Sequence, residues 1–259
     1  REAAGVPLIA VRGQDGKVHA FRNACRHRGM RIADGTGCTH AFMCRYHGWT
    51  YGLDGALRHV PHEAGFPGLD KSTHGLVPVK AEERSGLIFI TQDGEANALG
   101  DLPDLIAKDQ VIYATTERDI DANWKIFLEG FLEGYHIRAT HPETFLPYGF
   151  DNLTLLETFG RNSRITFPFK RIKKLTDVPE AQRKVGGLVT YVYHLFPNAL
   201  VTILSSHTNL VILEPISLEK TRFVSYTLTN AGNGQSEEAL AAAKRDAEFV
   251  GNTGAAEDR

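Results

Sequence analysis

Short segments of alternating apolar and polar residues, each closed by a turn, fill the chain up to about residue 95. The Asp-Gly pairs in QDGK and LDGA favour tight hairpins. The segments are PLIAVRG, KVHAFRN, AFMCRY, GWTYGLDGALRHV and RSGLIFITQDG. This pattern predicts a small antiparallel β domain over residues 1–95.

The pattern is interrupted in GEANALGDLPDLIAKD, which contains Gly, Asn and Pro but no alternation. Such a stretch is typical of a linker, so we expect one over residues 96–110, with one short helix.

From residue 111 to residue 259 the pattern predicts a second domain that mixes helices and strands. In TERDIDANWKIFLEGFLEGYHI, apolar side chains recur at helical spacing, which predicts an amphipathic helix. Five strand-like segments follow, and SEEALAAAKRDAEFV then predicts a C-terminal helix with Ser236 as its N-cap. The strand-like segments are LLETFGRNSRITF, GLVTYVYHLF, ALVTILSS, TNLVILEPIS and KTRFVSYTLTN. The expected fold class is therefore α+β, with a curved antiparallel sheet that grips helices.

Composition narrows the functional classes. The chain is 42% hydrophobic and 23% charged, with a net charge of −2, which argues against nucleic acid or an anionic membrane as the main partner. No stretch approaches the roughly 20 apolar residues that a membrane-spanning helix needs. Three cysteines are too few for a disulfide scaffold and, beside histidines, they point to metal binding in a reducing compartment such as the cytoplasm.

Two thiol–imidazole pairs form the first candidate metal site. CRHRGM contains Cys25 and His27, and CRYHGW contains Cys44 and His47. Four such ligands on two loops suit zinc or an iron–sulfur cluster, and the ligand chemistry alone leaves both open.

The surrounding residues favour the cluster, because CRHRG and CRYHGW resemble the two loops of a Rieske [2Fe–2S] domain. In that family two cysteines hold one iron and two histidines the other, which implies these roles for the four residues above. Respiratory Rieske proteins carry an extra cysteine in each loop, where this chain has Met30 and Tyr46. The resemblance is therefore to the lower-potential oxygenase or ferredoxin type.

A second candidate metal site lies in LEGYHIRATHP. Glu133 and His136 are three residues apart, which on a helix places them on one face. His141 precedes Pro142, so the helix is expected to end between the two histidines and let their imidazoles converge. Two imidazoles and a carboxylate suit non-haem iron(II), although the pair taken alone fits a structural role equally well.

The pattern NWK…E…LEGYH…HP resembles the catalytic motif of Rieske non-haem iron oxygenase α subunits, the aromatic ring-hydroxylating dioxygenase family. The resemblance implies a helix-grip catalytic domain, with mononuclear iron held by His136, His141 and a downstream Asp. Asp258 is the best match, Glu257 the nearest rival, and Asp246 a poorer one. Family members extend beyond this sequence at both ends, so the resemblance implies a fragment truncated at both ends.

The resemblance also implies how the parts work. Electrons from NAD(P)H reach the Rieske cluster through a separate reductase, with or without a ferredoxin. O₂ is activated at iron(II) to dihydroxylate, monooxygenate or oxidatively dealkylate a small organic substrate, which the resemblance implies to be aromatic. Glu133 would bridge an iron-binding histidine to a cluster histidine of a neighbouring subunit. This implies a homotrimer or a hetero-oligomer with a β subunit.

An apolar substrate pocket is expected in the second domain. Its candidate residues are Phe127, Phe131, Phe145 and His207, each of which has an alternative role in the core. Two other functions remain open: a Rieske electron-transfer protein with a metal-free, ligand-binding helix-grip domain, and a zinc-binding structural protein.

Overall fold

The computed structural model describes residues 2–3, 5–84, 86–92, 102–230, 232, 236–252 and 257–258. The chain divides into two compact units, Arg1–Ala98 and Leu99–Arg259. Of the expected linker, residues 96–101 lie outside the described residues. Within the described ranges, no helix is long and apolar enough to cross a membrane.

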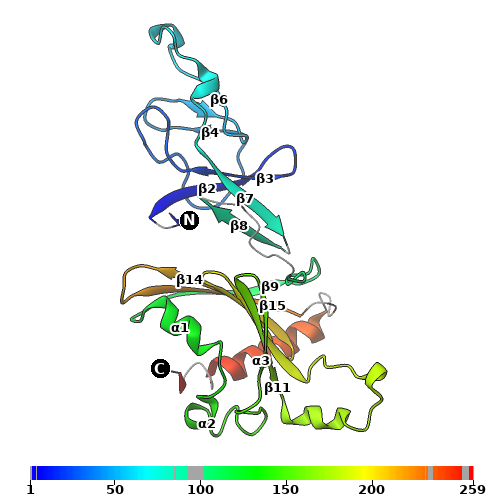
Figure 1. Cartoon of the computed structure of the whole chain (residues 1–259). Helices are drawn as coiled ribbons and strands as arrows, with labels where there is room; N and C mark the ends of the chain where they lie inside the picture. Colours follow the sequence, from blue (N-terminus) through cyan, green and yellow to red (C-terminus); the bar gives the residue numbers. More distant parts are fainter. Residues whose placement is uncertain are drawn as a thin grey trace. The chain divides into compact units, whose positions relative to one another are not determined.

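The first unit consists of two antiparallel sheets (Figure 1). The larger sheet has the strand order β1-β2-β3-β7-β8 and the smaller one has the order β4-β5-β6. The strands are β1 (Glu2–Ala3), β2 (Val6–Arg12), β3 (Val18–Arg22), β4 (Phe42–Met43), β5 (Thr50–Tyr51), β6 (Leu57–His59), β7 (Pro78–Arg84) and β8 (Leu87–Thr91), with short 3-10 helices at Glu63–Gly65 and Lys71–Thr73.

Both Asp-Gly turns form as the sequence predicts. Gly16 and Gly55 have φ of 76° and 81°, a left-handed conformation that only glycine adopts without cost. These turns join β2 to β3 and β5 to β6. The core of the unit is built mainly from residues of the loops and the small sheet, and it includes Cys25, Cys44, Trp49 and Tyr51.

The second unit is one seven-stranded antiparallel sheet with helices on one face (Figure 1). Its strand order is β10-β11-β12-β13-β14-β15-β9. The strands are β9 (Ile112–Ile120), β10 (Leu155–Phe159), β11 (Asn162–Pro168), β12 (Val189–Leu195), β13 (Ala199–Ile203), β14 (His207–Pro215) and β15 (Thr221–Thr229). The helices are α1 (Trp124–Gly130), α2 (Ile137–Thr140) and α3 (Glu237–Asn252), with 3-10 segments at Lys170–Leu175 and Glu180–Gln182.

One face of this sheet carries the core that positions α1. Leu128 of α1 is buried against Val211, Leu213 and Phe223 of the adjacent strands β14 and β15. The helix α3 lies on the same face (Figure 1), and the Ser236 hydroxyl accepts a hydrogen bond from the Ala239 amide, as expected of an N-cap. The α+β class and the curved antiparallel sheet are therefore confirmed.

Three strands were not predicted. The two-residue strand β1 precedes the first strand-like segment, PLIAVRG. The alternation of β7 is hidden among charged residues in PVKAEER, and β9 lies in IYATTERDI, directly before the predicted helix. Since β9 pairs with β15 over its whole length, it closes one edge of the seven-stranded sheet.

The prediction of one helix through Tyr135 is wrong. The helix α1 ends at Gly130, and Glu133 and Gly134 are not helical. The Glu133 carboxylate accepts hydrogen bonds from the amides of Tyr135 and His136, which replaces helical hydrogen bonding in this turn. A separate short helix, α2, then lies between the two histidines, with His136 at its N-cap and His141 at its C-cap.

Candidate metal centres

The two Cys–His loops of the first unit have the same backbone hydrogen bonds. In the first, the Cys25 amide donates to the Met30 carbonyl at 2.8 Å and the Gly29 amide donates to the Cys25 carbonyl at 2.8 Å. In the second, the Cys44 amide donates to the Trp49 carbonyl at 2.8 Å and the Gly48 amide to the Cys44 carbonyl at 2.9 Å. Both loops thus turn back within six residues and present a thiol and an imidazole.

Both loop glycines have φ of 72°. This left-handed conformation, at Gly29 and Gly48, explains why each loop needs glycine after its His-containing turn.

The four side chains fit a [2Fe–2S] cluster. Cys25 and Cys44 are buried free thiols. The rings of His27 and His47 are 4.6 Å apart between centroids, and the Nδ1 atom of His27 is buried without a hydrogen-bond partner. A buried, unpaired ring nitrogen is costly unless a metal takes it, so this orphan atom supports a ligand role. Burial, and then the neighbours His47 and Arg28, lower the pKa of His27 and favour the neutral ring that binds metal.

Tyr51 contacts the first cluster loop, which the sequence did not predict. Its side chain is fully buried, and its hydroxyl accepts the Arg26 amide at 3.0 Å and lies 3.2 Å from the Cys25 sulfur. Burial, together with the hydrogen bond to Cys25, raises the pKa of Tyr51 above its ordinary value and opposes loss of the hydroxyl proton.

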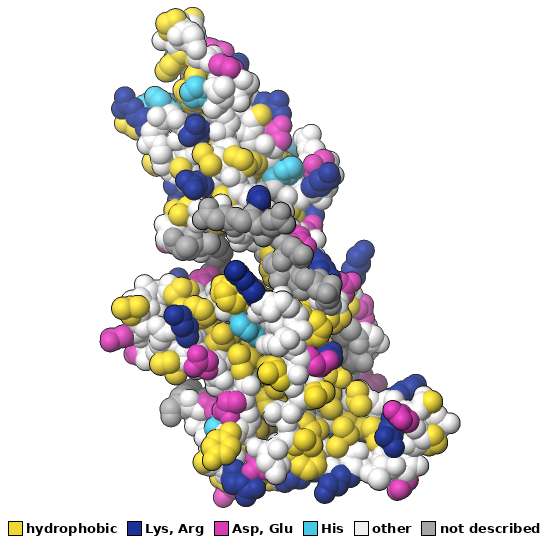
Figure 2. All heavy atoms as spheres, viewed as in Figure 1, with side chains coloured by type: hydrophobic (Ala, Val, Ile, Leu, Met, Phe, Trp, Pro, Cys, Tyr) yellow, Lys and Arg dark blue, Asp and Glu magenta, His cyan; other side chains and the backbone are white. Residues whose placement is uncertain are grey.

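Two aromatic residues of the second loop differ in exposure. Trp49 is buried and stacks on His27 at 5.0 Å between ring centroids, whereas Tyr46 is exposed beside His47. Cys38 is an exposed free thiol. The face of the molecule drawn in Figure 2 shows basic and acidic side chains interspersed, which agrees with the small net charge.

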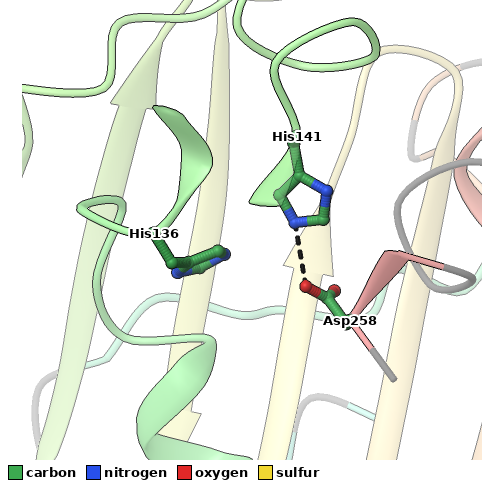
Figure 3. A group of neighbouring side chains, drawn as sticks. All are labelled: His136, His141 and Asp258. Carbon is green, nitrogen blue, oxygen red and sulfur yellow. Dashed lines mark ion pairs between the residues drawn. The ribbon is translucent and has the colours of Figure 1, made fainter. Parts of the chain in front are cut away.

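The second group of candidate ligands is brought together by α2 and the end of the chain. One ligand atom from each of His136, His141 and Asp258 lies within 4.8 Å of the others. Figure 3 shows the three side chains converging, with the Asp258 carboxylate against His141. Two imidazoles and one carboxylate form the donor set that non-haem iron(II) takes, so these residues fit such an ion.

Glu133 holds the first imidazole. Its carboxylate makes a short contact with Nδ1 of His136. Burial raises the pKa of Glu133, but the hydrogen bonds from His136 and the Tyr135 amide outweigh it, so the net pKa is lowered and the group stays ionised. A carboxylate at Nδ1 keeps the proton there and leaves Nε2 as the free ligand atom.

Glu257 and Asp258 contact opposite nitrogens of His141, which is only 1% exposed. Oε2 of Glu257 is 2.7 Å from Nδ1, and Oδ1 of Asp258 is 2.9 Å from Nε2. The Thr144 hydroxyl also donates to Glu257, at 2.6 Å. These hydrogen bonds, first that of Thr144 and then that of His141, lower the pKa of Glu257.

The expected pocket residues are placed in different surroundings. Phe145 lies 4.9 Å from His141 between ring centroids, next to the candidate iron site. Phe127 and Phe131 instead pack against the α1 core cluster, 5.3 Å from each other.

His207 is buried, and its Nδ1 lies 2.8 Å from the carboxylate of Asp246 on α3. Asp246 also accepts the Ser206 amide at 2.9 Å, so it joins the start of β14 to α3. Asp246 is not among the three converging ligands.

Comparisons with known proteins match both units. The Rieske [2Fe-2S] domain family matches residues 1–74, and the family described as the ring hydroxylating alpha subunit (catalytic domain) matches residues 109–259. The second match covers more than half of the chain.

Curated relatives include oxygenase subunits that act on quaternary ammonium compounds. The carnitine monooxygenase oxygenase subunit of Escherichia coli (strain K12) is 33% identical over 189 residues, which cover 66% of this chain and 50% of that protein. The glycine betaine monooxygenase oxygenase subunit of Chromohalobacter salexigens is 38% identical over 146 residues, 53% of this chain and 33% of that protein. This chain thus spans half or less of the length of these relatives.

Solved structures agree on the fold. The quaternary ammonium Rieske monooxygenase CntA, in complex with L-carnitine, superposes with a TM-score of 0.72 at 23% identity, over 100% of this chain and 72% of that one. Naphthalene 1,2-dioxygenase with bound indole gives a TM-score of 0.74 at 22% identity, over 95% of this chain and 65% of that one.

Proposed function

Because this chain belongs to the family of Rieske-type ring-hydroxylating oxygenase α subunits, we propose that it is the terminal oxygenase of a Rieske non-haem iron system. The observation that carries the proposal is the convergence of His136, His141 and Asp258 in a chain that also has the two Cys–His loops. The same observation disfavours an electron-transfer protein whose second domain lacks metal.

The cluster ligands in this proposal are Cys25, His27, Cys44 and His47, and the mononuclear iron ligands are His136, His141 and Asp258. When bound, the cluster supplies single electrons and the iron(II) supplies the place where O₂ is reduced beside the substrate. The protein orients the ligands. Glu133 keeps the Nδ1 proton of His136, and the buried surroundings of His141 exclude water from its ring.

Glu133 is also the residue that we propose bridges subunits. Its carboxylate is partly exposed, so one oxygen can accept a second N–H, from His27 or His47 of a neighbouring copy. Such a bridge would form in a homotrimer or in a hetero-oligomer with a β subunit. A separate reductase, with or without a ferredoxin, would deliver electrons from NAD(P)H. The free thiols of the cluster loops suit the cytoplasm.

The substrate we propose is a small quaternary ammonium compound. Support comes from the relatives named for carnitine and glycine betaine, and from the choline monooxygenase of Spinacia oleracea, which is 27% identical over 241 residues. Oxidation would then hydroxylate a carbon next to nitrogen or remove an alkyl group. Phe145, which contacts His141, is the proposed pocket residue closest to this chemistry. Aromatic rings suit a quaternary ammonium group through cation–π attraction.

A turnover assay tests this function. Full-length protein, a Rieske oxygenase reductase and NADH are incubated under air with carnitine, glycine betaine, choline or indole, and product is measured by mass spectrometry. We expect oxygenated or dealkylated product from at least one ammonium compound and none from the His136→Ala variant. If only indole is converted, the proposed substrate class is rejected. If none of the four compounds is converted although both metals are bound, the result counts against oxygenase function.

A further inference from the structure

The proposed function leaves Glu257 without a role, although it makes one of the best-defined polar contacts near the iron ligands. Its Oε2 atom lies 2.7 Å from Nδ1 of His141 and accepts the Thr144 hydroxyl at 2.6 Å. His141 itself is nearly inaccessible to solvent. Because no water reaches this ring to satisfy its second nitrogen, the partner at Nδ1 determines which nitrogen carries the proton.

Glu257 and Asp258, which are adjacent in sequence, each contact a different ring nitrogen of His141. Asp258 approaches Nε2, on the side where His136 also offers a ligand atom, whereas Glu257 approaches Nδ1. The Nδ1 and Nε2 atoms of an imidazole point away from each other in the plane of the ring. A carboxylate oxygen at Nδ1 therefore cannot at the same time reach an ion at Nε2.

We propose that Glu257 is a positioning residue, which fixes His141 as the Nδ1–H tautomer and aims its Nε2 at the iron, while Asp258 is the carboxylate ligand. This inference rests on the proposed function, since it needs iron at the three converging side chains. The Thr144 hydroxyl, by donating to Glu257, holds the carboxylate in place. Glu257 then does for His141 what Glu133 does for His136.

The arrangement has a physical consequence for metal affinity. A metal-bound imidazole that donates its other N–H to a carboxylate is more basic and is fixed in orientation, and loss of that partner costs about 10- to 100-fold in metal affinity. Glu133 is proposed to serve the neighbouring subunit as well, whereas the hydrogen bonds of Glu257 with His141 and Thr144 lie within its own unit. We therefore expect Glu257 to affect the iron site of its own chain and not the contact between subunits.

The test is an anaerobic Fe(II) titration of the full chain with its cluster intact, with the dissociation constant as the readout. We expect about 10- to 100-fold weaker binding for Glu257→Ala and a smaller loss for Glu257→Gln, which keeps an acceptor oxygen. Thr144→Val should also raise the Fe(II) dissociation constant, because it removes the hydroxyl that holds Glu257 in place. Glu143→Gln is the matched control, because Glu143 is exposed near His141 and has no recorded partner among the described residues. It should bind as the wild type does.

A second readout separates positioning from folding. The thermal midpoint of the iron-free protein should move little for Glu257→Gln, because its amide oxygen can still accept the Nδ1–H of His141 and the side chain is partly exposed. Wild-type Fe(II) affinity in Glu257→Ala would overturn the inference.

Asp258→Asn distinguishes the inference from the function on which it rests. Loss of Fe(II) binding in Asp258→Asn with no effect of Glu257→Ala would reject the role of Glu257 alone. Wild-type binding in Asp258→Asn, with none in Glu257→Ala, would make Glu257 the ligand and overturn the inference. Wild-type binding in both would remove the proposed iron site itself.

Discussion

Tyr51 is the side chain with which the small sheet reaches the cluster loops. Its hydroxyl oxygen accepts the Arg26 amide and lies 3.2 Å from the Cys25 sulfur, a contact in which either atom could be the donor. When Cys25 is a thiolate ligand it has no proton of its own, and Tyr51 becomes the donor of this hydrogen bond. Hydrogen bonds to cluster sulfurs stabilise the reduced, more negative state and so raise the reduction potential.

We expect Tyr51→Phe to lower the midpoint potential of the cluster. If the hydrogen bond favours reduction by a factor of about ten, the shift is about 59 mV for one electron. An EPR-monitored redox titration measures it, with Tyr46→Phe as the control, since Tyr46 is an exposed tyrosine of the second loop. An unchanged potential in Tyr51→Phe, with full sulfide content, would show that the hydroxyl does not bond to the sulfur.

The candidate cluster ligands could be predicted from the sequence because they lie within short loops, where spacing determines geometry. They are Cys25, His27, Cys44 and His47. The side chains that contact candidate ligands from distant parts of the sequence could not be predicted. Tyr51 reaches Cys25 across 26 residues, and Glu257 reaches His141 across 116. Contacts between residues so far apart depend on strand pairing and on the path of α3, which local patterns do not encode.

The break between α1 and α2 also could not be predicted from the spacing of apolar residues. The apolar spacing from Trp124 to Tyr135 suggested one helix, but the side chain of Glu133 binds backbone amides and Gly134 follows it directly. Local side-chain hydrogen bonds of this kind compete with the helix. The break lets His136 and His141 cap the two ends of α2, so the convergence of the imidazoles was predicted correctly on the basis of an incorrect helix.

The helix α3 is held to the sheet by a buried polar contact. Asp246 accepts hydrogen bonds from His207 and from the Ser206 amide, and the Tyr113 hydroxyl of β9 donates to the Ala243 carbonyl of the same helix. Burial raises the pKa of Asp246, but the hydrogen bonds from His207 and Ser206 outweigh it, and the net pKa is lowered. This anchor fixes the helix that precedes Glu257 and Asp258.

Asp246→Asn should lower the free energy of unfolding near pH 7 by about 1–3 kcal/mol, because it weakens hydrogen bonds to a charged group. A carboxyl whose pKa is lowered by folding stabilises the protein above its ordinary pKa, and that stabilisation is lost as the pH falls through the lowered folded value. The difference between wild type and variant should therefore shrink below about pH 4.

Urea unfolding at a series of pH values measures this difference. The control is Glu248→Gln, on the exposed side of the same helix. If Asp246→Asn unfolds at the same urea concentration as the wild type at pH 7, the contact does not anchor α3.

Across the molecule, the proposed bridge at Glu133 would couple the cluster of one subunit to the iron of the next. In Glu133→Gln the neutral amide should leave cluster and iron bound but slow product formation, because the link between imidazoles is weakened. The comparison is product formed per NADH oxidised, with metal content measured on the same samples. Wild-type turnover in a fully loaded Glu133→Gln protein would remove the bridging role.

In the proposed function, one chain holds both a Rieske cluster and a mononuclear iron. Anaerobic iron and sulfide analysis of the full-length protein tests it most directly, with EPR of the reduced cluster, on wild type and on His136→Ala. We expect about three irons and about two sulfides per wild-type chain, and about two irons in the variant with an unchanged cluster signal. About two irons in both proteins would contradict it and would indicate an electron-transfer protein with a metal-free second domain.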